Sequence, residues 1–422
     1  MSKIQVQQAI EIGRSETSRT LGAGNGFDEA LDRSNLSTAK WEMEVARKND
    51  PSLLCFGTAE MDFRSAPPVL EALDRIVKAG HFGYPYKRAS YYDAITGYFQ
   101  RHFGWRVEKS SIASNVGIYP SMQPIIEELT AVGDEIIYQP PVHHIFPEVI
   151  SAAGRVAIAN PLKKRNGRYE MDFDDLAAKA SERTKLLLLC SPHNPVGRVW
   201  TREELARLHE ICSERRIVIV TDEVYCGLIY EGVPFLPFAA LSPEASMNSI
   251  TLVSASKSFN VTGLKHSLVI AENPRLLDAY MNGLKRNNLY YGGCIFGQAA
   301  TEAAFRDCDD WSKQLVRYIK GNFDLLKSFF REHLPEVEVT EPEATYFAWL
   351  DFSALGLSGQ QLRQLFEDES HITVAYGNVL GAGGEGHIRI NLATSRSTLE
   401  KGLQRLAEAY RRRQEISPQA TT

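Results

Sequence analysis

The chain has 422 residues, 44% of them hydrophobic and 23% charged, which is the composition of a globular protein with more than one domain. A formal net charge of −5, with lysines and arginines dispersed along the chain, gives no basic surface for nucleic acid or an anionic membrane, so neither is expected as a partner. The sequence contains no run of about 18 apolar residues and no signal-peptide core, which predicts a cytoplasmic protein.

Residues 1–60 show no repeated strand-helix unit, and we expect this segment to pack with a smaller domain. From about residue 65 to 275, short apolar runs alternate with amphipathic stretches, as in a mostly parallel sheet covered by helices. We therefore assign residues 61–296 to a large domain. Four runs are apolar on both faces and are predicted to be buried strands, at 135–138, 185–190, 217–221 and 250–254.

Helix signals lie between and after these runs. Thr201 followed by Glu204 and leucines at helical spacing is a capping box that starts a helix over 201–212. From residue 297 the pattern changes to long helices, including 311–330, followed by strands near 346–350 and 386–392. Residues 297–422 are therefore predicted to form a smaller α+β domain.

Polar side chains follow three of the predicted strands. Asn194 comes after the run ending at Cys190, Asp222 follows the run ending at 221, and Lys257 follows the run at 250–254. About one strand-helix unit separates neighbouring members, 28 residues from Asn194 to Asp222 and 35 from Asp222 to Lys257. Ligands of open parallel sheets bind at the strand ends, so we expect these residues to line one edge of the sheet.

Lys257 lies among small hydroxyl residues at the end of a predicted buried strand. A lysine is rarely buried without a partner, and one explanation is covalent chemistry with an aldehyde cofactor, which needs a neutral amine. The alternative is a lysine on a solvated turn.

Asp222 at the same edge needs a positive partner, and a protonated pyridine nitrogen would supply one. Asn194 and Tyr225 could then donate hydrogen bonds to a phenolic oxygen on that ring. Taken alone, Asn-Pro is a common turn and an Asp after a strand is often a helix N-cap. The coincidence of several strand ends favours the cofactor interpretation.

The order of these motifs, completed by Arg389 late in the chain, resembles fold-type I enzymes that use pyridoxal 5′-phosphate (PLP), over nearly the whole length. The resemblance implies an α/β fold with a large domain, whose mostly parallel seven-stranded sheet is sandwiched by helices, plus the smaller α+β domain. More narrowly, the chain resembles the MalY/PatB branch, which contains cystathionine β-lyase-like C-S lyases. The segments that carry this likeness are 61–63, 82–84, 194–200, 256–260 with 263–264, and 384–391.

The resemblance also implies roles. Lys257 would form the internal aldimine and, once released, carry protons to and from the substrate and cofactor, while Asp222 pairs the ring nitrogen. Arg389 would clamp the substrate carboxylate, assisted by Asn194. Tyr84 would reach the phosphate bound by the neighbouring subunit of a homodimer. The phosphate in turn would be held by Ser254, Ser256, Lys265 and the backbone of Gly117, Ile118 and Tyr119.

Three positions depart from the branch. His143 stands where relatives usually place a Tyr that stacks on the cofactor ring, and it could serve as an aromatic substitute or exchange a proton. Val224-Tyr225 replaces the Ile-His common in lyases of this branch and matches aminotransferases instead. Lys265 stands where aminotransferases commonly have an Arg.

We therefore predict a PLP-dependent enzyme acting on an amino acid through a Lys257 aldimine and a quinonoid, with β- or γ-elimination as the leading reaction. The alternatives are transamination, or a specialised β/γ-replacement or cyclisation in secondary metabolism. A non-catalytic protein that keeps the fold is a further alternative, opposed by the intact Lys257, Asp222 and Arg389. No metal site is expected, because the His143-His144 pair has no carboxylate or cysteine at ligand spacing.

Overall fold

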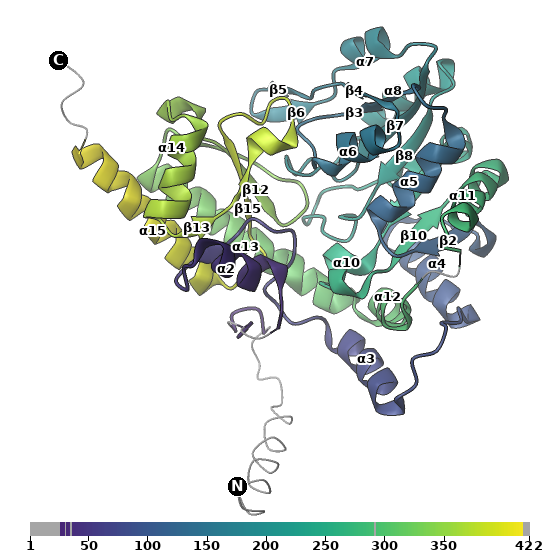
Figure 1. Cartoon of the computed structure of the whole chain (residues 1–422), viewed down its shortest axis with the longest axis horizontal. Coiled ribbons are helices and arrows are strands. Elements are labelled where there is room, and N and C mark those ends of the chain that lie inside the picture. The colour runs from purple at the N-terminus through teal and green to yellow at the C-terminus, as the bar shows by residue number, and fades with distance from the viewer. Residues whose placement is uncertain (1–25, 30, 34–35, 291–292, 417–422) are drawn as a thin grey trace, which may run out of the picture.

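The computed structural model describes residues 26–29, 31–33, 36–290 and 293–416 (Figure 1). Its central feature is the predicted seven-stranded sheet. β10 runs opposite in direction to the other six strands, so the sheet is mostly parallel. In spatial order the strands are β2 (Ile112–Asn115), β10 (Ser267–Ile270), β9 (Ser249–Val253), β8 (Val218–Asp222), β7 (Thr184–Cys190), β3 (Glu135–Tyr138) and β4 (Val156–Ala159).

The four strands expected from apolar runs are all present as β3, β7, β8 and β9, each within one residue of its predicted ends. Their side chains alternate between two apolar layers, because successive residues of a strand point to opposite faces. In β7, Leu186 and Leu188 join one layer, whereas Leu187 and Leu189 join the other. Burial on both faces explains why these strands are continuously apolar.

Helices pack against both faces of the seven-stranded sheet. On one face lie α5 (Ile118–Leu129), α6 (Ile145–Ala152) and α11 (Pro274–Arg286). The other face packs against α4 (Ala89–Phe103) and α12 (Ile295–Asp307), with α3 (Pro67–Ala79) beyond them, and against α7 (Phe173–Lys179) and α8 (Arg202–Glu214). Helix α8 has the predicted capping box between Thr201 and Glu204. Smaller elements at the periphery are β5 (Lys163–Arg165), β6 (Arg168–Glu170) and α9 (Pro243–Met247).

The C-terminal region forms a second layered unit beside the large sheet (Figure 1). Its antiparallel sheet has the order β11 (Glu338–Thr340), β12 (Phe347–Asp351), β15 (His387–Asn391) and β14 (Ala375–Tyr376). Its helices are α13 (Asp309–His333), α14 (Gly359–Arg363) and α15 (Arg396–Ile416). The predicted α+β character is therefore present.

The N-terminal segment contacts this second unit. After α2 (Glu44–Lys48), strand β1 (Leu54–Cys55) pairs in parallel with β13 (Ile372–Thr373). The packing of residues 1–60 with the smaller domain stays a prediction, and residues 1–25, 30 and 34–35 lie outside the described part. The boundaries at 60 and 296 stay predictions. Within the described ranges, no helix is both long and apolar enough to cross a lipid bilayer.

Candidate active site

The ends of three central strands lie level with one another. The register pairs Cys190 of β7 with Asp222 of β8, and Asp222 with Leu252 of β9. Asp222 is the last residue of β8, and Asn194 and Lys257 come shortly after the ends of the adjacent strands β7 and β9, as the spacing of the motifs predicted. This edge is where open parallel sheets bind their ligands.

Lys257 lies in the short helix α10 (Ala255–Ser258), which follows β9. Its Nζ donates a hydrogen bond to the backbone carbonyl of Ala59, at 2.7 Å. Burial, reinforced by the positive charge of Arg389, lowers the pKa of Lys257 to about 8. A large fraction of the amine is thus neutral slightly above neutral pH, which is the state that a nucleophilic lysine needs.

Asp222 is buried at the end of β8, where one of its oxygens accepts a hydrogen bond from the Val224 backbone at 3.2 Å. Burial raises the pKa of this carboxyl to about 6. The hydrogen bond from the Val224 backbone and the positive charge of Lys257 offset this rise only in part. The adjacent Glu223 is also buried, and its pKa is raised to about 8, so it is mostly neutral at pH 7. Asp222 is therefore the carboxylate that a cationic ligand at this edge would stabilise.

Arg389 reaches the same edge from β15 of the C-terminal unit. Its guanidinium donates to Oδ1 of Asn194 and to the Gly57 carbonyl, each at 2.9 Å, and lies 4.0 Å from the ring centroid of Phe347. Its Nε is buried without a hydrogen-bond partner in the described structure. A fixed guanidinium suits a planar carboxylate, and Asn194 holds it in place.

Tyr225 is buried beside Tyr346, with ring centroids 5.6 Å apart. Burial raises the pKa of Tyr225 far enough to keep the phenol protonated at neutral pH. The hydroxyl can therefore donate a hydrogen bond, which is the role that the sequence assigned to it.

The predicted phosphate ligands lie around the starts of two helices. Gly117 is the N-cap of α5, followed by Ile118 and Tyr119, and Ser256 lies in the first turn of α10. Ser254 caps α10, and its hydroxyl also donates to the His266 carbonyl at 2.6 Å. The exposed Lys265 follows the short turn after α10. Their phosphate contacts stay predictions.

His143 stacks on Tyr119, with ring centroids 5.4 Å apart and ring planes inclined by 23°. Burial, aided by the positive charge of Arg389, lowers the pKa of His143 to about 3. The imidazole is therefore neutral across the physiological range. Of the two roles considered for His143, this favours the stacking aromatic over a proton carrier that titrates near pH 7.

Replacing His143 with phenylalanine tests this assignment. We expect kcat to fall by less than about tenfold, because loss of a general acid or base typically costs about 10² to 10⁴. The shape of the pH profile between about pH 6 and 9 should stay unchanged, since the wild-type imidazole does not titrate there. Disappearance of one limb of the profile would show that His143 transfers a proton.

The described side chains meet the chemical demands of PLP. Lys257 offers a partly neutral amine for its aldehyde, and Asp222 offers a buried carboxylate for its ring nitrogen. None of the ion pairs in the described part of the chain includes Asp222. No described cationic side chain therefore already forms a salt bridge with this carboxylate, and a cationic ligand could pair with it. The Nε of Arg389, which has no hydrogen-bond partner in the described structure, can donate a further hydrogen bond to an anionic substrate group.

Sequence reasoning missed two parts of this site. The segment 57–61 has no helical or strand periodicity, yet its backbone accepts hydrogen bonds from Lys257 and Arg389. Asn391 was noted within a motif but given no role, although it donates to two carbonyls of the same segment. Its position two residues after Arg389 was the available signal, because such residues share one face of a strand.

Comparison with known proteins agrees with this geometry. Residues 57–406 match the family model of aminotransferase class I and II. The chain is 35% identical over 385 residues to cystathionine beta-lyase PatB of Bacillus subtilis, covering 91% of this chain and 99% of PatB.

Two solved structures extend the comparison. A PLP-bound putative aminotransferase from Clostridium difficile has a TM-score of 0.88 and 34% identity, covering 91% of this chain and 99% of that one. Cystalysin from Treponema denticola, which contains PLP, has a TM-score of 0.89 and 27% identity, with coverage of 92% and 98%. The similarity therefore spans both the large sheet and the C-terminal unit.

Proposed function

The chain belongs to the aminotransferase class I and II family of PLP-dependent enzymes, and we propose that it eliminates a sulfur leaving group from the β- or γ-carbon of an amino acid. The observation that carries this proposal is the Lys257, Asp222 and Arg389 arrangement in a chain matched over 91% of its length by a cystathionine beta-lyase. Overall, the amino acid and one water would give a 2-oxo acid, ammonium and a thiol. When bound, PLP supplies an aldehyde and an electron-withdrawing ring that stabilises negative charge at the substrate Cα.

Substrate orientation is assigned to Arg389 and Asn194. The guanidinium binds the α-carboxylate, and the 2.9 Å hydrogen bond to Asn194 fixes its plane. Phe347 covers one face of the guanidinium and shields it from water. A carboxylate held in this way presents the Cα proton in a defined direction, and such orientation lowers the barrier of the reaction.

Proton transfer is assigned to Lys257. Its lowered pKa lets the amine accept the Cα proton at near-neutral pH and pass a proton to the departing sulfur. The buried Asp222 would maintain positive charge on the ring of bound PLP, and the buried Tyr225 would donate a hydrogen bond to its phenolic oxygen.

The proposed active unit is a homodimer. Tyr84 is 94% exposed, and Phe82 and Tyr86 beside it are also exposed. Three large aromatic side chains exposed within five residues favour a protein contact at this segment. In a dimer, Tyr84 would contribute its hydroxyl to the phosphate site of the neighbouring subunit.

Product analysis tests the elimination reaction. The PLP-loaded protein should release a 2-oxo acid, ammonium and thiol in equal amounts from cystathionine or an S-alkyl cysteine, without a 2-oxo acid acceptor. Alanine, which has no leaving group, is the matched control and should yield none of these products.

Transamination is the second candidate, favoured by the aminotransferase-like Asp222-Glu223-Val224-Tyr225 motif. In that case the 2-oxo acid would form only when an acceptor is added, and an amino acid would form from the acceptor. A product with a new carbon-carbon or carbon-nitrogen bond would instead indicate replacement or cyclisation. Either result would reject elimination as the main reaction.

A further inference from the structure

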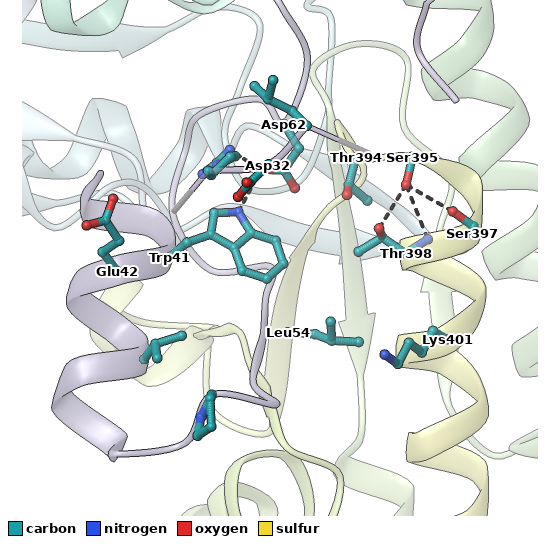
Figure 2. Close-up of a pocket in the computed structure, with 14 residues that line it drawn as sticks. Asp32, Trp41, Glu42, Leu54, Asp62, Thr394, Ser395, Ser397, Thr398 and Lys401 are labelled. Atoms are coloured by element: carbon teal, nitrogen blue, oxygen red, sulfur yellow. Dashed lines mark hydrogen bonds and ion pairs between the residues drawn. The ribbon is translucent and has the colours of Figure 1, made fainter. Parts of the chain in front are cut away.

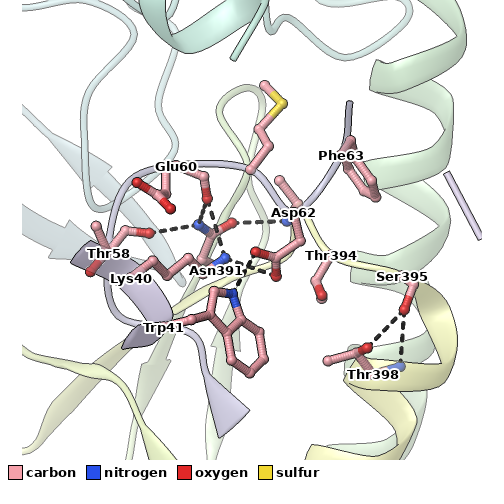
Figure 3. Close-up of polar contacts among 12 residues, drawn as sticks. Lys40, Trp41, Thr58, Glu60, Asp62, Phe63, Asn391, Thr394, Ser395 and Thr398 are labelled. Carbon is pink, nitrogen blue, oxygen red and sulfur yellow. Dashed lines mark hydrogen bonds and ion pairs between the residues drawn. The ribbon is translucent and has the colours of Figure 1, made fainter. Parts of the chain in front are cut away.

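The backbone of residues 57–61 is held by side chains at every carbonyl. Figure 3 shows the central part of this arrangement, in which Asn391 bridges Thr58 and Glu60. The donors, in order along the segment, are Arg389 to Gly57, Asn391 to Thr58, Lys257 to Ala59, Asn391 and Lys40 to Glu60, and Arg33 and Asn260 to Met61. An irregular segment held in this way has a fixed backbone.

Two of these donors are the residues assigned to proton transfer and carboxylate binding. Lys257 and Arg389 contact carbonyls that are only two residues apart, at 2.7 and 2.9 Å. They come from different structural units, because Lys257 follows the large sheet and Arg389 belongs to β15. Residues 57–61 are therefore a backbone support that Lys257 and Arg389 share, and a shift of this support would move both hydrogen bonds.

Asn391 holds the support on both sides of Ala59. Its Nδ2 donates to the carbonyls of Thr58 and Glu60, each at 2.7 Å, and its Oδ1 accepts from the Ala393 backbone at 2.9 Å. The side chain is fully buried, so water cannot replace it. An amide offers two donors and one acceptor at this position, whereas a carboxylate would face two carbonyl oxygens. In the described structure, an apolar side chain would leave the Thr58 carbonyl with only the Glu60 backbone N–H and the Glu60 carbonyl with only Lys40.

A buried cluster of charges fixes the far end of the segment. Asp62 forms an ion pair with the fully buried Lys40 at 3.0 Å and accepts from Trp41 Nε1 at 2.9 Å. Arg33 also pairs with Asp62, and it reaches Glu60 at 2.9 Å. These contacts join the N-terminal segment to the support, beside Asn391 (Figure 3).

A cavity of about 590 Å³ lies against this cluster, with Trp41, Leu54, Asp62, Thr398 and Lys401 among its lining residues (Figure 2). Neither Lys257 nor Arg389 lines it. Substitutions of Asp62 or Trp41 would alter the cavity as well as the segment, whereas Asn391 does not line it. Asn391 is thus a side chain whose replacement tests the support without removing a residue that lines the cavity.

We propose that Asn391 is a positioning residue, which sets the Lys257 amine and the Arg389 guanidinium relative to each other by fixing the Ala59 carbonyl between those of Thr58 and Glu60. This proposal deepens the proposed function and rests on it for the roles of Lys257 and Arg389. Loss of the Asn391 amide removes one hydrogen bond from each of the Thr58 and Glu60 carbonyls, lets the segment shift, and weakens the hydrogen bond that the Lys257 amine makes to Ala59. A misplacement of about 1 Å is enough to slow an enzymatic reaction about 100-fold.

Asn322 provides a matched control. It is a fully buried asparagine whose Nδ2 also bridges two carbonyls, those of Leu392 and Thr394, each at 2.9 Å. Both of those carbonyls lie outside residues 57–61. Asn322→Ala therefore removes the same kind of buried amide from the same region without removing a hydrogen bond to residues 57–61.

The experiment compares Asn391→Ala with Asn322→Ala in two assays. In the first, cofactor-free protein is mixed with PLP, and the rate of covalent attachment is followed by absorbance across pH. A carbonyl acceptor favours the charged form of an amine, so its loss should move the pH midpoint of attachment downward in Asn391→Ala and leave it unchanged in Asn322→Ala. In the second assay, kcat should fall about 10- to 100-fold in Asn391→Ala and less than about threefold in Asn322→Ala.

If the alanine variant does not fold, Asn391→Ser, which keeps one donor, should give the same changes at smaller size. An unchanged midpoint together with unchanged kcat in a folded Asn391 variant would overturn the proposal. Equal changes in the Asn391 and Asn322 variants would also overturn it, because the effect would then be general destabilisation. The attachment assay needs no turnover, so a failure of the proposed elimination would appear only in the second assay.

Discussion

Replacing Lys257 with alanine is expected to abolish covalent attachment of PLP and to lower kcat by at least about 10⁴-fold. The amine is both the group that attaches the cofactor and the proposed proton carrier, and loss of a proton carrier alone costs about 10² to 10⁴. Attachment is measured by absorbance of the protein after removal of free PLP, and kcat by release of the 2-oxo acid. A band that persisted in Lys257→Ala would place the attachment on another residue.

Lys257→Arg is the matched variant, because it keeps the positive charge and a long side chain but cannot provide a neutral amine. It should be as inactive as Lys257→Ala. Activity above that of the alanine variant would show that charge, rather than amine chemistry, is the contribution of this residue.

The pH dependence of attachment follows from the same amine. The pKa of Lys257 is lowered to about 8, so below that pH the cofactor-free protein carries mostly ammonium, which is not nucleophilic. The attachment rate of the wild-type protein should therefore rise about tenfold per pH unit below pH 8 and level off above it. A rate that is constant between about pH 6 and 8 would contradict this ionisation.

The parts of the fold that were predictable are those with a regular sequence pattern. Strands β3, β7, β8 and β9 are continuous apolar runs because both of their faces are buried. Once these strands were placed, Asn194, Asp222 and Lys257 followed as the polar residues at their ends. The order of those motifs, together with Arg389, was enough to indicate the family and its cofactor.

The parts that were not predictable depend on the backbone and on tertiary contacts. The Ala59 carbonyl accepts from Lys257, but a backbone atom leaves no signature in the identity of the residue. The sequence offered Ser254 as a phosphate ligand, and only the structure shows that its hydroxyl already donates to the His266 carbonyl. The low pKa of His143 likewise arises from packing and from Arg389, which is distant in sequence.

Asp222→Asn is expected to lower kcat by about 10² to 10³-fold and, in the cofactor-free protein, to increase stability at neutral pH. The catalytic loss follows because a neutral amide cannot maintain positive charge on the cofactor ring, and removal of one such electrostatic contact typically has this effect. The gain in stability follows because the wild-type protein must ionise a buried carboxyl that has no cationic ligand. The two effects have opposite signs, which distinguishes a functional carboxylate from a structural one.

The pH dependence of this gain has a defined sign. The pKa of Asp222 is about 6 in the folded protein, against 3.8 ordinarily, so the folded state binds the proton more tightly than the unfolded state. The stabilisation from this proton is fully present below about pH 4 and is lost as the pH rises through 6, at a cost of up to about 3 kcal/mol at neutral pH. Asparagine does not ionise, so the variant avoids this cost.

Thermal unfolding of the cofactor-free proteins measures the difference. The Tm of Asp222→Asn should exceed that of the wild type above about pH 6, and the gap should close near pH 4. Addition of PLP should reverse the order, because a cationic ring pairs with Asp222 and not with asparagine. A variant that is less stable than the wild type by the same amount at every pH, with or without PLP, would mean that Asp222 stabilises the fold through its hydrogen bond to Val224 and has no role toward the cofactor.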